Sequence, residues 1–325
     1  MTEPMHSPEA ADRTGAQTST LDEDLQSAVD TVNRVVLDKP EQVRLVFAAL
    51  LAGGHVLVED LPGVGKTTLA HAIAEVVDGQ WHRVQFTSDL LPADILGVSI
   101  WNREHEQFEF RPGPIFANVV LADEINRATP RTQSALLEAM AEGQVSIDGT
   151  THPLPQPFFV IGTQNPLDLA GTYALPDSQL DRFLVKISLG YPDQAHERSL
   201  LIEPDRKQLL EQIQPQLTIE RLQQLVQLSR CVHVSEPVLD YIQALVQATR
   251  EHPAVSAGLS TRAAIALVRV SQAYAKLAAM AYVLPDHVQA VFPALAEHRL
   301  HCKPNAGDRQ DIVNDILANT AVDRG

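Results

Sequence analysis

Short apolar runs recur along the first part of the chain, and each has the length of a strand buried on both faces. Amphipathic stretches separate these runs, and one of them places Leu69, Ala72, Ile73, Val76 and Val77 on one helical face. This alternation predicts an α/β fold with a parallel sheet of about five strands flanked by helices. The predicted strands are 55–59, 83–86, 119–124, 158–162 and 183–189, and the predicted helices include 25–51, 66–77 and 132–142.

Two other stretches alternate apolar and polar residues and predict hairpins. Residues 97–110 carry the prominent aromatic side chains Trp101, Phe108 and Phe110. Residues 144–148 lead into Asp148-Gly149, a dipeptide typical of a tight hairpin turn. The first hairpin is either a functional insertion or a plain surface hairpin, and the pattern alone leaves both open.

The strand pattern stops near residue 192, and helix start signals such as Thr218, Ser235 and Ser260 follow. We therefore expect residues 25–191 to form the α/β core and residues 192–325 to form an all-α domain.

The first 24 residues are rich in Ser, Thr, Pro and acids, without a basic flank or an apolar stretch. We expect residues 1–24 to be a disordered leader and not a signal peptide.

Residues 59–68 read Glu-Asp-Leu-Pro-Gly-Val-Gly-Lys-Thr-Thr and join the first predicted strand to the next helix. This order is typical of a phosphate-binding loop, in which backbone N–H groups and a helix N-terminus face one anion. Lys66 would reach the outer phosphates, and the Thr67 hydroxyl would ligate Mg²⁺. Asp60 stands where the strict pattern has glycine, so its carboxylate must point away from the phosphates. The predicted nucleotide-binding residues are Pro62, Gly63, Val64, Gly65, Lys66, Thr67 and Thr68.

Polar side chains also follow the later strands, at the edge of the sheet where ligands bind in α/β folds. Asp123 and Glu124 end the run 119–124, and Asn165 follows the run 158–162. We expect Asp123 to hold Mg²⁺, Glu124 to take a proton from the attacking water, and Asn165 to orient that water.

Two arginines are candidates for contacts with the γ-phosphate. Arg182 precedes an apolar run, and an arginine supplied by a neighbouring subunit raises hydrolysis rates by about 10³ or more. Arg262 falls in the first turn of a helix capped by Ser260, where a cation opposes the helix dipole and indicates a partner anion. The alternative for both is an ordinary surface arginine.

Taken in order, these motifs resemble the MoxR family of AAA+ ATPases. The resemblance rests on residues 59–67, 85–97, 110–118, 121–128, 133–140 and 171–176, and it extends more weakly to residues 259–262. It implies the Walker A role for Lys66 and Thr67, the Walker B role for Asp123 and Glu124, sensor 1 for Asn165, the arginine finger for Arg182 and sensor 2 for Arg262. Arg127 would contact a neighbouring subunit.

The resemblance also implies a helical lid, hairpin insertions that face a ring pore, and ATP-driven, chaperone-like machines that form hexameric rings. Such machines remodel or mature protein complexes, often with partners that carry a von Willebrand factor A domain. Asp38 departs from the family, because relatives usually have glycine there, and this segment helps to frame the adenine. In the expected mechanism, the lid clasps ATP through Arg262, and Arg182 of the neighbour completes the site.

Composition limits the alternatives. The net charge of −16 disfavours bulk attraction to nucleic acid, so an ATP-driven nucleic-acid motor is the weaker hypothesis. A nucleotide-gated scaffold without turnover is a third hypothesis, which the complete catalytic set disfavours. The chain has only Cys231 and Cys302 and no apolar run that could span a membrane. We expect a cytoplasmic protein with ATP and Mg²⁺.

Overall fold

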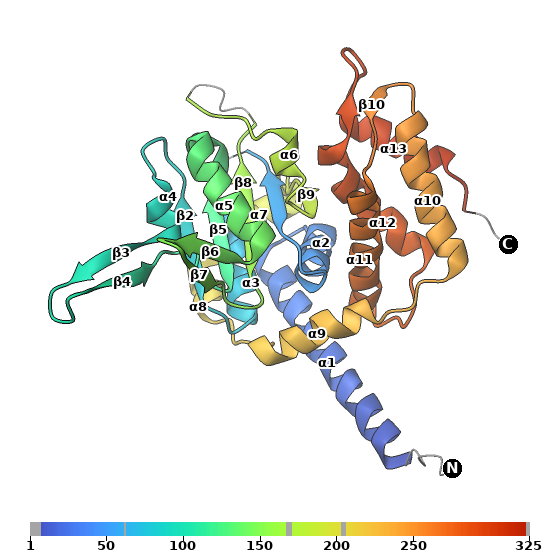
Figure 1. The fold of residues 1–325 in the computed structure, drawn as a ribbon. Helices are drawn as coiled ribbons and strands as arrows, with labels where there is room; N and C mark the ends of the chain where they lie inside the picture. Colours follow the sequence, from blue (N-terminus) through green and yellow to red (C-terminus); the bar gives the residue numbers. More distant parts are fainter. Residues whose placement is uncertain (1–7, 62, 167–170, 203–205, 323–325) are drawn as a thin grey trace, which may run out of the picture.

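The computed structural model describes residues 8–61, 63–166, 171–202 and 206–322. Five parallel strands form one sheet in the order β2–β5–β8–β1–β9 (Figure 1). This confirms the predicted parallel sheet and its number of strands. The strands are β1 (Val56–Glu59), β2 (Trp81–Gln85), β5 (Val119–Asp123), β8 (Phe159–Gln164) and β9 (Val185–Ile187).

Both faces of the sheet are covered, because successive residues of a strand point to opposite faces. Val119 and Leu121 belong to the hydrophobic cluster that includes α1, α2 and α3. Val120 and Ala122 belong to a second cluster, which includes α4 and α5. The helices are α1 (Pro8–Val35), α2 (Pro40–Leu51), α3 (Lys66–Val76), α4 (Pro92–Leu96) and α5 (Pro130–Glu142).

Both predicted hairpins are present. Strands β3 (Gly97–Asn102) and β4 (Gln107–Pro112) pair in register and extend away from the body of the molecule (Figure 1). Strands β6 (Gln144–Ile147) and β7 (Thr150–Pro153) join through Asp148-Gly149, which both have positive φ, as a tight hairpin turn requires.

The C-terminal part is helical, as predicted, and packs on the core mainly through contacts of α11 with α2. It also contains two short strands that the sequence pattern did not indicate, β10 (Val255–Ala257) and β11 (His301–Cys302). The helices are α9 (Ile219–Arg230), α10 (Glu236–Glu251), α11 (Thr261–Leu277), α12 (Pro285–Ala296) and α13 (Arg309–Asn319).

Two short helices, α7 (Gln194–Ile202) and α8 (Arg206–Glu211), connect the core to this region. The core also contains α6 (Asp177–Leu180) before β9 and the 3₁₀ turn η1 (Ile125–Arg127) after β5, and the 3₁₀ turn η2 (Glu297–Arg299) follows α12. Helix α8 packs beside α1 and α3. The chain therefore returns to the core after residue 192, before the helical region begins with α9.

The N-terminal segment differs from the expected disordered leader, because helix α1 already begins at Pro8. Leu21 is buried in the core, and Asp24 forms an ion pair with Arg221 of α9. These contacts stabilise the end of the segment as a helix. They involve residues far away in the sequence, so the local composition that predicted disorder gives no sign of them. Residues 1–7 lie outside the described part.

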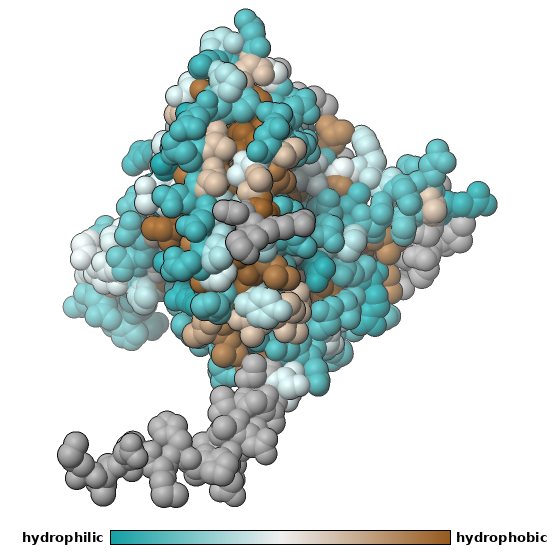
Figure 2. All heavy atoms as spheres, turned by 90° about the vertical axis from the view of Figure 1, so that its right-hand side faces the viewer, coloured by the Kyte–Doolittle hydropathy of each residue, from teal (hydrophilic) through white to brown (hydrophobic). Residues whose placement is uncertain are grey.

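The face on the side of α10 and α13 is largely hydrophilic, and its apolar side chains lie in separate small groups (Figure 2). Among the described residues, no helix is long and apolar enough to cross a bilayer.

Candidate functional site

The loop after β1 presents its backbone toward the N-terminus of α3. Gly63 and Gly65 have φ of 85° and 98°, backbone conformations that residues with a Cβ rarely adopt. A Cβ built on either glycine would meet no atom within 4 Å, so the space beside the backbone is open. Val64 and the first-turn residues Thr67 and Thr68 are half-buried. The two glycines thus leave open space beside the loop backbone, which allows an anion to approach closely. Pro62 lies outside the described residues.

Lys66 is buried at the first position of α3. Its Nζ donates to the Asp60 carbonyl oxygen at 2.8 Å and lies 3.5 Å from the Gln164 carbonyl oxygen. Burial lowers the pKa of Lys66, and the nearby charges of Asp123, Asp60 and Glu124 oppose that shift. An ammonium has three N–H donors, so this buried cation retains the capacity to bind a phosphate oxygen.

The Asp60 carboxylate points away from the anion cradle. Its Oδ2 accepts hydrogen bonds from the backbone N–H groups of Leu189 and Gly190, at 2.6 and 2.7 Å, and from the Ser188 hydroxyl at 3.0 Å. Its Oδ1 accepts from the Leu61 N–H at 2.9 Å. Asp60 therefore anchors the phosphate-binding loop to the segment that follows β9.

We expect Asp60→Gly, which restores the strict loop pattern, to lower the free energy of unfolding by about 2–4 kcal/mol, since four hydrogen bonds to a buried carboxylate are lost. Asp60→Asn keeps one oxygen for Leu189 and Gly190 and should lose about half as much. Denaturant titration measures both variants, with Asp240→Asn on the exposed face of α10 as the control. Wild-type stability of Asp60→Gly would contradict this role.

The two acids after β5 are held in different ways. Asp123 Oδ1 accepts from the Thr163 hydroxyl and Oδ2 accepts from Arg83 Nη2, both at 2.6 Å. Glu124 has a left-handed φ of 57°, and its N–H donates to the same Thr163 hydroxyl oxygen at 2.9 Å. Thr163 therefore fixes both acids against the neighbouring strand β8.

The Glu124 carboxylate is held by two further side chains. Its Oε2 accepts from Gln85 Nε2 at 2.8 Å and lies 3.1 Å from Arg127 Nε. Arg127 was expected to contact a neighbouring subunit, and in the structure it pairs with Glu124 of its own chain. Sequence analysis missed Gln85 and Arg83, although both lie on β2, which pairs with β5 and places Gln85 opposite Asp123.

Asn165 is buried directly after β8, at the same carboxyl edge of the sheet as the phosphate-binding loop and the two acids. Its carbonyl oxygen accepts from Asn126 Nδ2 at 3.4 Å. The structure thus brings together Lys66, Asp123, Glu124 and Asn165, as predicted. A glycine loop with open space beside its backbone, a buried ammonium under the influence of the Asp123 and Glu124 charges, and the Thr67 hydroxyl in the next helical turn fit a nucleoside triphosphate with a hard cation.

The two arginines lie at the opposite, amino edge of the sheet. Arg182 and Arg262 line one cavity of about 560 Å³ with Gly54 and His55, which precede β1. Arg182 Nη1 donates to the Leu137 carbonyl oxygen of α5 at 2.6 Å. The structure therefore places Arg262 near Arg182 and not near Lys66 of its own chain. This differs from the expectation that the lid clasps, through Arg262, the ATP bound by the same subunit.

The position of Arg262 follows from the packing of the lid. Ser260 caps α11 as predicted and accepts from the Ala263 N–H at 3.2 Å, which places Arg262 in the first turn. That turn lies beside Arg299, whose pKa is lowered by burial and further by the charge of Arg262, against the raising effect of Asp181. Arg262 and Arg269 are exposed on the same helix at this cavity.

His55 also lines this cavity and is buried and neutral. Its Nδ1 accepts from the Val160 N–H at 3.1 Å, so its Nε2 carries the proton that it donates to the Met140 carbonyl oxygen at 3.2 Å. Burial lowers the pKa of His55 to about 4. The positive charge of the cavity therefore comes from its arginines.

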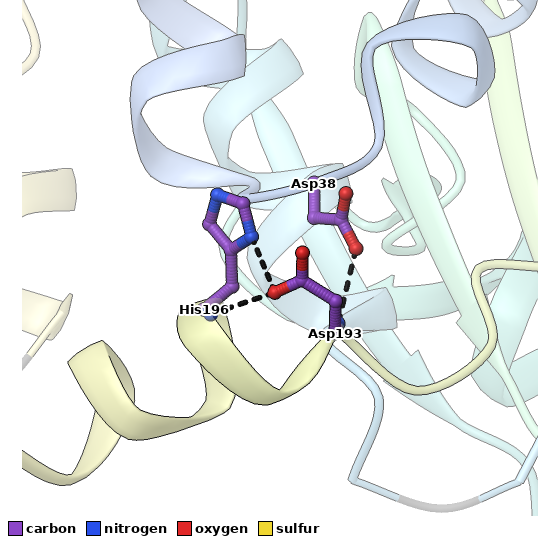
Figure 3. A group of neighbouring side chains, drawn as sticks. All are labelled: Asp38, Asp193 and His196. Carbon is purple, nitrogen blue, oxygen red and sulfur yellow. Dashed lines mark hydrogen bonds and ion pairs between the residues drawn. The ribbon is translucent and has the colours of Figure 1, made fainter.

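Asp38 has a φ of 60°, the left-handed conformation that favours glycine, which explains why a glycine is expected at this position. Its carboxylate accepts from the Asp193 N–H at 3.1 Å, and Asp193 in turn accepts from the backbone and ring of His196 (Figure 3). The two hydrogen bonds from His196 lower the pKa of Asp193. Asp38 thus connects the turn between α1 and α2 to the start of α7.

Comparison with known proteins agrees with this geometry. The profile of the ATPase family associated with various cellular activities (AAA) matches residues 55–185, and the AAA lid domain matches residues 247–316. YeaC of Bacillus subtilis is 48% identical, over 92% of this chain and 94% of its own length. Chaperone MoxR1 of Mycobacterium tuberculosis is 38% identical, over 92% of this chain and 82% of its own.

A solved structure shows the same fold over nearly the whole length. The crystal structure of a proposed ATPase from Cytophaga hutchinsonii has a TM-score of 0.89 and 34% identity, and the match covers 97% of this chain and 99% of that one. Sequence relatives, fold and the arrangement of motifs lead to the same conclusion. The chain belongs to the MoxR family of AAA+ ATPases.

Proposed function

We propose that this protein hydrolyses ATP in a ring of identical subunits and uses the energy to remodel or mature protein complexes. One observation carries the proposal: the residues suited to hold a triphosphate and the arginines suited to complete its site lie at opposite edges of one sheet. Strand β1 has four residues, so these edges are more than about 10 Å apart. A single chain therefore cannot surround one triphosphate with both sets.

A second subunit resolves this separation. In a head-to-tail ring, the arginine cavity of one subunit faces the carboxyl edge of the next. Arg182 and Arg262 would then both approach the γ-phosphate held by the neighbour's Lys66. The exposed side chains along α11, Arg262, Ile265 and Arg269, are suited to such a contact.

The roles of this chain's residues in hydrolysis follow from their positions. The open loop and Lys66 bind the phosphates, and Thr67 and Asp123 would hold Mg²⁺, which neutralises phosphate charge when bound. Glu124 takes a proton from the attacking water as the bond from the γ-phosphorus to the bridging oxygen breaks, giving ADP and phosphate. Asn165 orients that water, and the neighbour's arginines stabilise the developing charge.

The proposed action on protein complexes is supported by the relatives. One of them is named a chaperone, which supports a chaperone-like role for this chain. We propose a hexameric ring in the cytoplasm, with protein clients and a partner that carries a von Willebrand factor A domain. Residues 25–191 would act as the nucleotide-binding core and residues 192–325 as the lid region.

Turnover that depends on protein concentration tests the proposal. We expect phosphate release per subunit to rise about 10-fold or more as dilute protein is concentrated through the assembly transition, because the arginines come from the neighbour. Sedimentation under the same conditions measures assembly. Turnover per subunit that stays constant while subunits associate would contradict a site shared between subunits.

A further inference from the structure

One arginine of the lid holds the backbone that carries Arg182. Arg299 Nε donates to Asp181 Oδ1 at 2.7 Å, and its Nη2 donates to the Phe183 carbonyl oxygen at 2.6 Å and to that of Asp181 at 3.3 Å. Its Nη1 donates to the carbonyl oxygens of Leu184 at 2.9 Å and Leu295 at 2.6 Å. All five N–H groups of the guanidinium are thus directed at this segment and at Leu295 of the preceding helix α12.

The neighbouring residues of η2 strengthen the same connection. His298 Nε2 lies 3.0 Å from the Phe183 carbonyl oxygen, and this histidine is fully buried. Glu297 pairs with Lys186 of β9 at 2.8 Å, and Lys186 also pairs with Glu59 of β1 at 2.6 Å. Three consecutive lid residues therefore contact either the segment that carries Arg182 or the strand that follows it.

Arg299 does not itself present a charge to a neighbouring subunit. Only 6% of its side chain is exposed, and Asp181 neutralises it. Both Arg299 and Arg182 line the cavity, but Arg182 is half-buried and forms no ion pair with an acid in the described part of the chain. The lid arginine is therefore suited to fix the backbone on either side of Arg182, while Arg182 remains available for an external anion.

We infer that Arg299 is a positioning residue through which the lid sets the location of the Arg182 guanidinium toward the neighbouring subunit's nucleotide. This inference rests on the proposed function. A displacement of about 1 Å at a catalytic group can cost about 10²-fold in rate. Movement of the lid would therefore change hydrolysis in the next subunit through the position of Arg182.

Arg299→Lys tests this, because an ammonium retains the charge but cannot make the forked contacts with Asp181, Phe183 and Leu184. We expect kcat to fall by about 10²-fold, with ATP affinity within about twofold of wild type, because the phosphate-binding loop is untouched. Arg221→Lys is the matched control: Arg221 Nη1 donates to Asp24 Oδ2 of α1, and Arg221 does not line the arginine cavity. It should keep wild-type turnover.

Mixed assemblies separate an effect on the neighbour from an effect on the variant's own site. A Lys66→Ala subunit keeps its Arg182 and Arg299, so mixing it with Arg299→Lys should restore turnover to well above that of either variant alone. Mixing Arg299→Lys with Arg182→Ala should restore none, because neither subunit supplies a well-placed finger. The reverse pattern would show that Arg299 serves its own nucleotide site and would overturn the inference.

Asp181→Asn provides a second variant in case Arg299→Lys does not fold. It keeps all four backbone carbonyl acceptors, those of residues 181, 183, 184 and 295, and removes one charged partner, so we expect about a 10-fold loss of kcat and the same mixing pattern. Thermal unfolding checks that the variant is folded. Wild-type kcat in the folded variants would overturn the inference and leave the proposed ATPase function intact. Absence of turnover in the wild type would instead count against the proposed function.

Discussion

Replacing Glu124 with Gln is expected to leave ATP binding within about twofold of wild type and to reduce turnover by about 10²–10⁴-fold. The amide has nearly the same shape and can still accept the hydrogen bond from Gln85. It is far too weak a base to take a proton from water. Binding and turnover therefore separate in this variant, which a nucleotide-gated scaffold without hydrolysis would not show.

The measurements are ATP affinity by titration with a fluorescent analogue and phosphate release at saturating ATP. Glu142→Gln, at the exposed end of α5, removes an equivalent carboxylate away from the site and serves as the control. Turnover at the wild-type rate in Glu124→Gln would exclude Glu124 as the base. The same variant loaded with ATP is also suited to capture clients, because it should hold the ATP-bound state.

The sheet could be predicted from the sequence because its signals are local. Each apolar run is a strand, and a polar residue after each run lies at the carboxyl edge, so Lys66, Asp123, Glu124 and Asn165 come together as expected. Parallel strands place all these ends at one edge whatever their order in the sheet. The positions of these residues follow from topology alone.

The parts that sequence reasoning missed depend on contacts between distant segments. The orientation of Asp60 is set by N–H groups of residues 189 and 190, and the Gln85–Glu124 hydrogen bond is set by the pairing of β2 with β5. Neither contact has a local signal. The position of Arg262 depends on how the lid packs, and the N-cap that correctly placed it on α11 says nothing of which edge of the sheet it meets.

Arg182→Ala is expected to reduce turnover by about 10³-fold or more, with ATP affinity nearly unchanged, because the guanidinium acts only in the transition state. Arg262→Ala should reduce turnover in the same direction, since both side chains line the same cavity at the amino edge. Phosphate release and nucleotide affinity measure the two effects separately. Arg309→Ala, in the first turn of α13, removes an arginine from outside the cavity and is the control.

Mixing two inactive variants in one assembly shows whether each arginine acts on the nucleotide of its own subunit or on that of the neighbour. Mixed with Lys66→Ala, which cannot bind ATP but supplies both arginines, Arg182→Ala and Arg262→Ala subunits should each regain turnover if both side chains act on the neighbour's nucleotide. If Arg262 instead acts on its own subunit's nucleotide, Arg262→Ala should regain turnover with Arg182→Ala and not with Lys66→Ala. Because the structure places Arg262 beside Arg182 and across the sheet from Lys66, we expect recovery with Lys66→Ala for both variants. No recovery of Arg182→Ala in any mixture would contradict a finger supplied by the neighbour.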